Sequence, residues 1–560
     1  MESSAFDGYN EKMLSEFLHI NPDVATMFGL HDPYDRLLPH GGFKRYKETD
    51  ELLALWTVTA SELGQKEELS VDQKLSLEVL GRWREIYRFG LYEYPLWKMY
   101  PDAFESIFTI LFQMLVNDYA PLTDRLSSIC QRINQIPVYL AQFRTRFSEE
   151  RINHEWVSSA IETCERFPKF LESIREVSRS VTDDTLAPSL NSGIELANEE
   201  LVAHLSWLHD LLQKPNLQFA MGKTKFERLM EIRGLPLTPD QILSLGERCI
   251  RELKEERCMV AERLIPGGSV IKVQAGINHD RPETFEEALR VAAELMAEAR
   301  EFVMKNGIAT VDEDAMAVVL ETPEFLRPII PFAMCYPPTR FDKQKKGVYF
   351  LTRPNNPDDL GGFCNKVTLI NTAVHEAFPG HFHQLALSTS KPWIFDLPLA
   401  VWSADWGSGV LPFATESVEG WALYCEQMML DHGYHESDEL AFQILTDAIF
   451  RACRIVADIK LAYGEVTTKG IAEWMAKETG MPLDGLAADV KFYAHSPGYV
   501  LSYMVGRHLI YKLRSDLESK LGPKFDEMMF HDLVASYGVL PFSMVENVVR
   551  SQMMKLAERE

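Results

Sequence analysis

Apolar residues recur every three to four positions along most of this chain, with polar and charged residues between them. This spacing is typical of helices that bury one face. In the first part of the chain, short turns containing Pro, Asn or Asp separate the stretches with this spacing, which are 10–30, 72–95, 105–150, 154–180 and 192–213. We therefore expect the first 235 residues to be all-α.

The next part of the chain contains two helices with clear start signals. At 238–241 (TPDQ), an N-cap threonine, a proline at the first helical position and a glutamine at the third precede an amphipathic run of about 26 residues. The run stops at 266–268 (PGG). The capping signal recurs at 284–287 (TFEE) before a second run, for which Gly307 is a natural C-terminal stop. Both runs predict long helices.

Strand-like sequence is confined to three short β-branched or aromatic segments, 347–352 (GVYFLT), 367–370 (VTLI) and 269–273 (SVIKV). The segment 316–364 is rich in Pro and Gly, which predicts a structured loop region before helix returns at about residue 371. A plain connector between two lobes has the same composition. The expected fold is therefore mainly α with a small β-sheet.

The chain is long and strongly acidic. Its 560 residues are more than a single hydrophobic core accommodates, so two or three lobes are expected. The 57 Lys and Arg residues against 82 Asp and Glu residues give a net charge of −25, which repels phosphate backbones and anionic lipid surfaces. We therefore expect neither a nucleic-acid nor a membrane partner, and composition leaves the oligomeric state open.

Nothing in the sequence predicts export or membrane insertion. The N-terminal residues lack the basic start and apolar run of a signal peptide, and the most apolar stretch, 393–414, is interrupted by charges, prolines and glycines. The eight cysteines include no Cys-x-x-Cys pair, which fits reduced, buried thiols. These features favour a cytoplasmic protein without disulfides or thiolate metal sites.

Three of the fifteen histidines lie within nine residues, in the segment 375–384 (HEAFPGHFHQ). In a zincin helix, two histidines one turn apart bind zinc, and the glutamate after the first takes a proton from the metal-bound water. Here His375 and Glu376 fit that pattern, but proline occupies position 379 and the next histidine is His381. In a regular helix, His375 and His381 would lie on separate faces.

Pro379 and Gly380 predict a break that changes this geometry. A proline ring clashes with the carbonyl four residues earlier, and glycine adopts backbone angles closed to other residues. Such a break could place His381 beside His375, as a zincin-like pair with a two-residue insertion. An ordinary helix–turn–helix junction with unrelated histidines fits the spacing equally well. His383 should point elsewhere, into the core or behind the ligands.

The segment 375–384 resembles the signature of the bacterial domain-of-unknown-function family 885, which is grouped with the gluzincin-type metallopeptidases. A second family motif is present at 419–426 (EGWALYCE), and 17–39 is similar to the opening of the family. The resemblance implies a mostly helical fold with a deep central cleft, related to zincin and neurolysin-like folds. It also implies an N-terminal helical lobe over 1–235 and a catalytic lobe over 236–560.

The resemblance also implies a zinc site. His375, His381 and Glu419 match the metal ligands of the family, and Glu376 matches the general base. Three protein ligands leave the fourth position of zinc to water, as catalytic sites require. Glu419 stands in an apolar helical setting where a nearby cation would offset its charge, although a solvated glutamate is the ordinary alternative. Glu426 and Tyr424 are candidates for supporting the ligands.

Downstream, 494–503 (AHSPGYVLSY) resembles an element of this family and the tyrosine-rich segment with which neurolysin-like peptidases stabilise the tetrahedral intermediate. The resemblance makes Tyr503, Tyr499 and His495 candidate donors to an oxyanion, although core tyrosines have the same pattern. The family usually has glutamine at position 499, and an arginine-tyrosine pair reads Phe-Tyr at 492–493 here. At these positions the chain differs from the family in residues that are expected to contact the substrate.

Arg451, Arg454 and Asp458 recur at helical spacing and match a run in the family. The two arginines are candidates for binding a substrate carboxylate, and an internal ion-pair network is an equal alternative. The segment 347–352 could be the edge strand to which extended peptides add, or an internal strand.

These observations predict a zinc-dependent hydrolase, a metallopeptidase acting on short peptides. Two alternatives stay open: a metal-dependent hydrolase or lyase acting on a non-peptide metabolite, and a non-catalytic helical protein that keeps a metal for structure. Because a structural site needs no base, Glu376 favours an enzyme.

Overall fold

The computed structural model describes residues 4–147, 152–181, 185–324, 327, 330, 332–342, 344–404, 411 and 413–558. Pro328 and Pro331, two prolines of the predicted loop region, lie outside these residues. Contacts between Cα atoms group the chain into two compact units. The first contains Met1–Met221, Thr339–Lys343 and Pro392–Phe413, and the second contains Gly222–Pro338, Gln344–Lys391 and Ala414–Glu560.

The first unit is helical. Apart from an isolated bridge between Ile152 and Asn216, its described residues contain no strand, which confirms the all-α prediction for this part of the chain. The predicted stretch 10–30 contains two helices, because Pro22 begins a new one. The helices are α1 (Ala5–Ile20), α2 (Pro22–Phe28), α3 (Phe43–Gly64), α4 (Val71–Arg88), α5 (Phe104–Val116), α6 (Leu122–Ile133), α7 (Ile136–Arg144), α8 (His154–Ser178), α9 (Leu186–Leu211) and α17 (Leu397–Ala404).

The second unit is also mainly helical, and both predicted capping signals are confirmed in it. The side chains of Thr238 and Gln241 each bond the backbone of the other residue, and Thr284 accepts from the amide of Glu287. The helices are α10 (Lys223–Arg233), α11 (Pro239–Leu264), α12 (Val270–His279), α13 (Phe285–Lys305), α14 (Leu360–Cys364), α15 (Lys366–Glu376), α16 (His381–Ser388), α18 (Thr415–Asp431), α19 (Asp438–Tyr463), α20 (Thr468–Thr479), α21 (Leu483–His495), α22 (Ser502–Leu521), α23 (Glu527–Ser536) and α24 (Phe542–Ala557).

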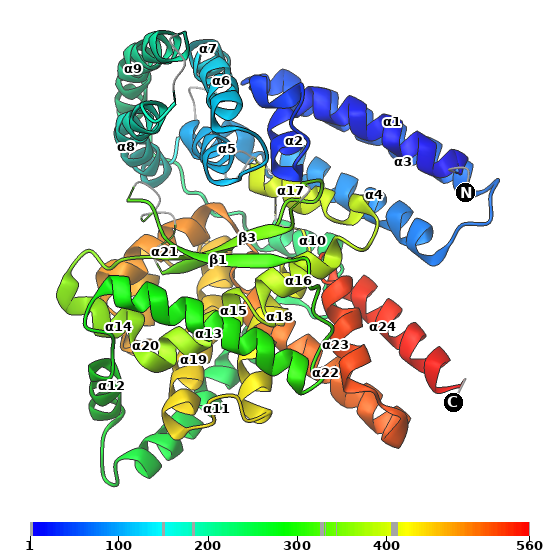
Figure 1. Cartoon of the computed structure of the whole chain (residues 1–560), viewed down its shortest axis with the longest axis vertical. Coiled ribbons are helices and arrows are strands. Elements are labelled where there is room, and N and C mark those ends of the chain that lie inside the picture. Colours follow the sequence, from blue (N-terminus) through cyan, green and yellow to red (C-terminus); the bar gives the residue numbers. More distant parts are fainter. Residues whose placement is uncertain are drawn as a thin grey trace. The chain divides into compact units, whose positions relative to one another are not determined.

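A three-stranded sheet completes the second unit (Figure 1). Its strands β1 (Met316–Glu321), β2 (Ala333–Tyr336) and β3 (Lys346–Leu351) have the order β1-β3-β2. β1 is parallel to β3, and β2 is antiparallel to it. The predicted strand at 347–352 is therefore the central strand of the sheet, and β2 is an edge strand. The prediction of a mainly α fold with a small sheet is confirmed, whereas the zincin-like or neurolysin-like fold and the central cleft stay predictions.

Two predicted strands are wrong. The segment 367–370 lies in α15, and 269–273 forms the start of α12. In both cases an N-cap at the start of the region begins a helix: Asn365, two residues before the first segment, accepts from the amide of Thr368, and Ser269, the first residue of the second segment, accepts from the amide of Lys272. A short β-branched run does not by itself distinguish a strand from a helix with such a cap.

The core of the second unit brings distant helices together. α15 packs against α13, α18 and α19, and β2 contacts both α15 and α16. α18 and α22 touch backbone to backbone, since a Cβ atom on Gly420 would lie 2.4 Å from Cα of Gly506. Only glycine permits this approach, which sets α22 directly beside the helix that carries Glu419.

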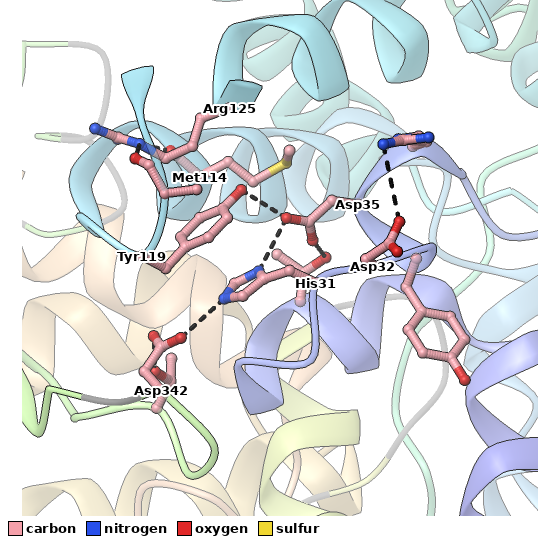
Figure 2. Close-up of polar contacts among 12 residues, drawn as sticks. His31, Asp32, Asp35, Met114, Tyr119, Arg125 and Asp342 are labelled. Carbon is pink, nitrogen blue, oxygen red and sulfur yellow. Dashed lines mark hydrogen bonds and ion pairs between the residues drawn. The ribbon is translucent and has the colours of Figure 1, made fainter. Parts of the chain in front are cut away.

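In the first unit, a short segment between β2 and β3 is bound to the N-terminal helices. His31 lies between two carboxylates, with Nδ1 at 2.9 Å from Asp35 and Nε2 at 2.8 Å from Asp342 (Figure 2). The His31 ring stacks on Tyr119, whose hydroxyl donates to Asp35. The amide of Phe341 donates to a carbonyl of α2. Among the described residues, no helix has the length and apolar character needed to cross a membrane.

Candidate metal centre

The helix that carries His375 is interrupted one residue later. α15 ends at Glu376, and α16 begins at His381. Pro379 has no N–H to donate to the carbonyl four residues earlier, which belongs to His375. The break predicted from Pro379 and Gly380 is therefore confirmed.

The hydrogen bonds across the break define its size. The amide of Gly380 donates to the carbonyl of Val374, and the amide of His383 donates to the carbonyl of Ala377. Each bond spans six residues, where a regular α-helix spans four. The break thus adds two residues to one helical turn, so His381 follows His375 as the residue one turn later would.

Gly380 is required at this position by space. A Cβ atom there would lie 1.9 Å from the carbonyl oxygen of His375 and 2.3 Å from that of Val374, both closer than any real contact. The break is also fixed from α18, because the indole of Trp421 donates to the carbonyl of Pro379 at 2.8 Å.

The break brings His381 beside His375, with ring centroids 4.8 Å apart. Glu419 on α18 completes a group of three, in which one ligand atom from each residue lies within 4.8 Å of the others. Nε2 of His381 lies 3.2 Å from Oε2 of Glu419. Ligands bound tetrahedrally at about 2.1 Å from zinc lie roughly 3.4 Å apart, so His381 and Glu419 have this spacing, whereas the group of three, at up to 4.8 Å, is wider.

The chemistry of these side chains also fits a metal ion. Two imidazoles and a carboxylate form a donor set that catalytic zinc sites use. All three side chains are buried, and Oε2 of Glu419 faces Nε2 of His381, with which it forms an ion pair only when the imidazole is protonated. A buried carboxylate that faces neutral imidazoles is costly, and a cation between Glu419 and the two imidazoles would remove that cost.

A second layer of polar residues supports His375. Its Nδ1 atom lies 2.7 Å from Oε1 of Glu426, which leaves Nε2 as the atom available to a ligand. The amide nitrogen of Asn371 donates to both Glu426 and Asp447, at 3.0 and 2.8 Å. Glu426 therefore contacts a candidate ligand, as the sequence suggested, but nothing in the sequence pattern marked Asn371 or Asp447.

Tyr424 and His383 have other partners. The hydroxyl of Tyr424 bonds His531 and accepts from Arg514. His383 is buried, with its two ring nitrogens at the carbonyls of Pro379 and Thr310. His383 is a core histidine, as predicted, and Tyr424 belongs to a separate network.

Glu376 is a buried carboxylate beside the three candidate ligands. Its pKa is raised to about 7, mainly by burial, while the charge of His381 lowers the pKa and that of Glu419 raises it. Its carboxylate also accepts from the backbone amide of Cys335 on β2. Burial raises the pKa of Glu419, but His381, His375 and the hydrogen bond from Tyr499 together lower it, to about 2. The surroundings therefore favour the ionised form of Glu419 and disfavour that of Glu376.

The two candidate tyrosines have different surroundings. The hydroxyl of Tyr499 donates to Oε1 of Glu419 at 2.5 Å, and the two tyrosine hydroxyls are themselves hydrogen-bond partners. The ring of Tyr503 lies nearly parallel to that of His375, with centroids 6.5 Å apart. His495 is buried, and its contacts include the hydroxyl of Ser496. The structure thus places Tyr499 and Tyr503 at the three candidate ligands.

The two candidate arginines also differ. Arg454 donates to Asp489 at 3.2 Å and to the hydroxyl of Tyr493, and its guanidinium lies 4.8 Å from the ring centroid of Tyr503. Arg451 is 3.9 Å from Glu426, and its Nε atom has no hydrogen-bond partner among the described residues. Both arginines therefore belong to internal networks, since Arg451 also pairs with Asp447 at 3.5 Å, but Arg451 keeps its Nε donor unused.

A family model described as "Bacterial protein of unknown function (DUF885)" matches residues 22–549. The chain also resembles two solved structures, each described as a "putative lipoprotein". The one from Shewanella oneidensis is 20% identical with a TM-score of 0.76, covering 98% of this chain and 100% of that one. The one from Colwellia psychrerythraea is 18% identical with a TM-score of 0.79, covering 98% and 99%. These likenesses show a shared fold. No curated protein matches the chain significantly.

Proposed function

The chain belongs to the DUF885 family of bacterial proteins of unknown function, and we propose that it is a zinc-dependent hydrolase of peptide-like bonds. One observation carries this proposal. The break between α15 and α16 brings His375 and His381 to Glu419, in a buried group with the donor set of a catalytic zinc site. Relationship to the gluzincin-type metallopeptidases is part of the same proposal.

Glu376 is the proposed general base. It directly follows His375, but it is not one of the three clustered ligands, and its raised pKa suits a group that takes a proton from water near neutral pH. Bound zinc would supply positive charge that acidifies water and shares the charge of an oxyanion. Glu376 then passes the proton to the leaving group.

Tyr503 is the proposed donor to the oxyanion. Its ring lies nearly parallel to that of His375, and its hydroxyl is a hydrogen-bond partner of Tyr499, which itself donates to Glu419. Because the hydroxyl bonds Tyr499 in this structure, it must turn from Tyr499 to substrate during the reaction. An oxyanion-hole donor of this kind typically contributes 10²- to 10³-fold in turnover.

The proposed substrate is a short peptide in an extended conformation. β2 is an edge strand, and the backbone amide of its Cys335 faces the carboxylate of Glu376. An extended peptide that pairs with β2 would therefore place a peptide bond near the proposed base. Arg451, with its unused donor, is the better of the two arginines for binding a substrate carboxylate.

Two other functions use the same residues. A metal-dependent hydrolase or lyase acting on a non-peptide metabolite would need the same base, and a structural metal protein would need none. A buried carboxylate that lies beside the three clustered ligands without being one of them, as Glu376 does, favours an enzyme over the structural role. A cytoplasmic location is proposed from the sequence and is testable by fractionation.

A peptide-library digest tests the proposal. The protein is stripped of metal with a chelator, reconstituted with zinc, and incubated with random short peptides, esters and amides. Cleavage of peptides that disappears with the chelator and returns with zinc supports the proposal. Cleavage of esters or amides alone would favour the non-peptide alternative, and no cleavage by the zinc-loaded protein would favour the structural one.

A further inference from the structure

The turn between α21 and α22 is held from one side by a buried aspartate on α19. Asp458 accepts the amide of Gly498 at 2.8 Å and the amide of Leu501 at 3.0 Å. Gly498 has a φ of +84°, in the region that favours glycine. Asp458 is only 1% exposed, so these two bonds fix the backbone of the turn in a place that water does not reach.

An arginine on α10 holds the same turn from the other side. Arg233 donates to the carbonyl of Gly498 and, at 3.0 Å, to the hydroxyl of Ser502. It also donates to Glu416 at 2.6 Å, and both partners of this ion pair are fully buried. Glu416 lies three residues before Glu419 on α18. Arg233 therefore ties the turn to the helix that carries the third candidate ligand.

Tyr499 lies within this turn and reaches the metal centre directly. Its hydroxyl donates to Oε1 of Glu419, whereas Oε2 of Glu419 faces His381. A phenol has one proton to donate. While it is bonded to Glu419, that proton cannot also stabilise an oxyanion. The geometry thus separates Tyr499 from Tyr503, which the sequence pattern treats alike.

We propose that Tyr499 is a positioning residue for Glu419, and that Asp458 acts on the metal centre through Tyr499 by fixing the turn 498–501. The inference rests on the proposed zinc site. Carboxylate ligands of metals are commonly oriented by hydrogen bonds from outer residues, and the loss of such a partner typically weakens metal binding 10- to 100-fold. Here the partner is a tyrosine whose own backbone is fixed by buried charges.

The test is a double-mutant cycle read by zinc affinity. Zinc dissociation constants are measured by chelator competition for the wild type, Tyr499→Phe, Asp458→Asn and the double variant. We expect each single variant to bind zinc about 10- to 100-fold more weakly. Because Asp458 acts through Tyr499, the double variant should be no weaker than the weaker single variant. The absorption spectrum of bound Co²⁺ should change in the same variants.

Asp102 provides a matched control. It is a buried aspartate of the first unit that accepts the amides of Phe104 and Glu105 at 2.9 and 3.0 Å. Asp102→Asn should lower the thermal unfolding midpoint while leaving zinc affinity unchanged. If it weakened zinc binding as much as Asp458→Asn does, the effect of Asp458 would be one of general stability and the inference would fall.

The possible outcomes separate this inference from the proposed function. If Tyr499→Phe bound zinc as tightly as the wild type, the inference would be overturned but the zinc site would stand. The same holds if the losses of zinc affinity in the two single variants added fully in the double variant. A wild type without zinc affinity would overturn both. A wild type that binds zinc but cleaves nothing would rule out the proposed hydrolase. The positioning role of Tyr499 could still be measured through zinc affinity. If Asp458→Asn failed to fold, Tyr499→Phe, which removes one oxygen atom, would still decide the role of Tyr499.

Discussion

Nδ1 of His375 lies 2.7 Å from Oε1 of Glu426, and both side chains are buried. A carboxylate at this position accepts the N–H of the imidazole, which fixes the tautomer and leaves the Nε2 lone pair for a metal. The same contact increases the electron density that His375 can give to a cation. Glu426 is therefore as much a part of the centre as the residues it supports.

Glu426→Gln should weaken zinc binding about 10- to 100-fold, because the amide keeps the shape of the side chain but removes the charge that supports His375. Zinc affinity by chelator competition measures the effect. Glu439→Gln, an exposed substitution in the first turn of α19, is the control and should leave zinc affinity unchanged. Equal affinities in both variants would show that Glu426 does not support a metal ligand.

Gly380→Ala should disrupt the break between α15 and α16. The added methyl group would overlap the carbonyl oxygen of His375, so the backbone must shift, at a cost of roughly 2–4 kcal/mol. We expect a lower unfolding midpoint and a loss of bound zinc. The control is Gly362→Ala in α14, where an added Cβ meets nothing within 4 Å. A fully zinc-loaded Gly380→Ala protein would contradict the role given to the break.

Local signals in the sequence predicted those parts of the fold that depend on neighbouring residues. The cap at 238–241 and the break at Pro379 are determined by side chains within a few positions of the backbone they affect. The segments 367–370 and 269–273 were misassigned, because a few β-branched residues carry less information than the N-cap before them.

The strand pairing of the sheet and the residues that hold the candidate metal centre in place depend on contacts between residues far apart in the sequence. β1 and β2 were not predicted and lie in the segment 316–364, which was expected to be a loop; their residues gain a partner only when the chain returns through β3. Among the site residues, motifs marked Glu376 and Glu419, but nothing local marks Arg233. Its partners Glu416, Gly498 and Ser502 lie more than 180 positions away in the sequence.

The pair of carboxylates around His31 predicts a pH dependence of stability. Burial lowers the pKa of His31, but the bonds to Asp342 and Asp35 raise it more, to about 9. A histidine pKa raised above its unfolded value of about 6.5 contributes stability that is fully present below that value and is lost as the pH rises through 9. The contribution below pH 6.5 is about 3 kcal/mol.

The measurement is the unfolding midpoint in denaturant between pH 6 and pH 10. The wild type should lose stability over this range, whereas His31→Gln should be less stable at pH 6 and change less with pH. His209→Gln, which replaces an exposed histidine of the same unit, should follow the wild-type profile. If the stability of His31→Gln changed with pH in parallel with that of the wild type, the contacts of His31 with Asp35 and Asp342 would contribute no pH-dependent stability.

Tyr503→Phe should separate turnover from metal binding. The hydroxyl of Tyr503 is the proposed oxyanion donor. Its hydrogen-bond partner is Tyr499, and it is Tyr499 that donates to the candidate ligand Glu419. We expect zinc affinity close to wild type and a fall in kcat of about 10²- to 10³-fold. For Tyr499→Phe, by contrast, we expect zinc binding to be weaker than in the wild type. An unchanged kcat in Tyr503→Phe would remove that residue from the reaction.

The most direct test of the proposed hydrolase is Glu376→Gln, with zinc content and turnover measured on the same preparation. Glutamine keeps the volume of the side chain and removes the base. The account predicts about one zinc per chain in both proteins and a loss of roughly 10²- to 10⁴-fold in turnover on any substrate that the wild type cleaves. Wild-type turnover by a zinc-loaded Glu376→Gln protein, or a wild type that binds no zinc, would contradict it.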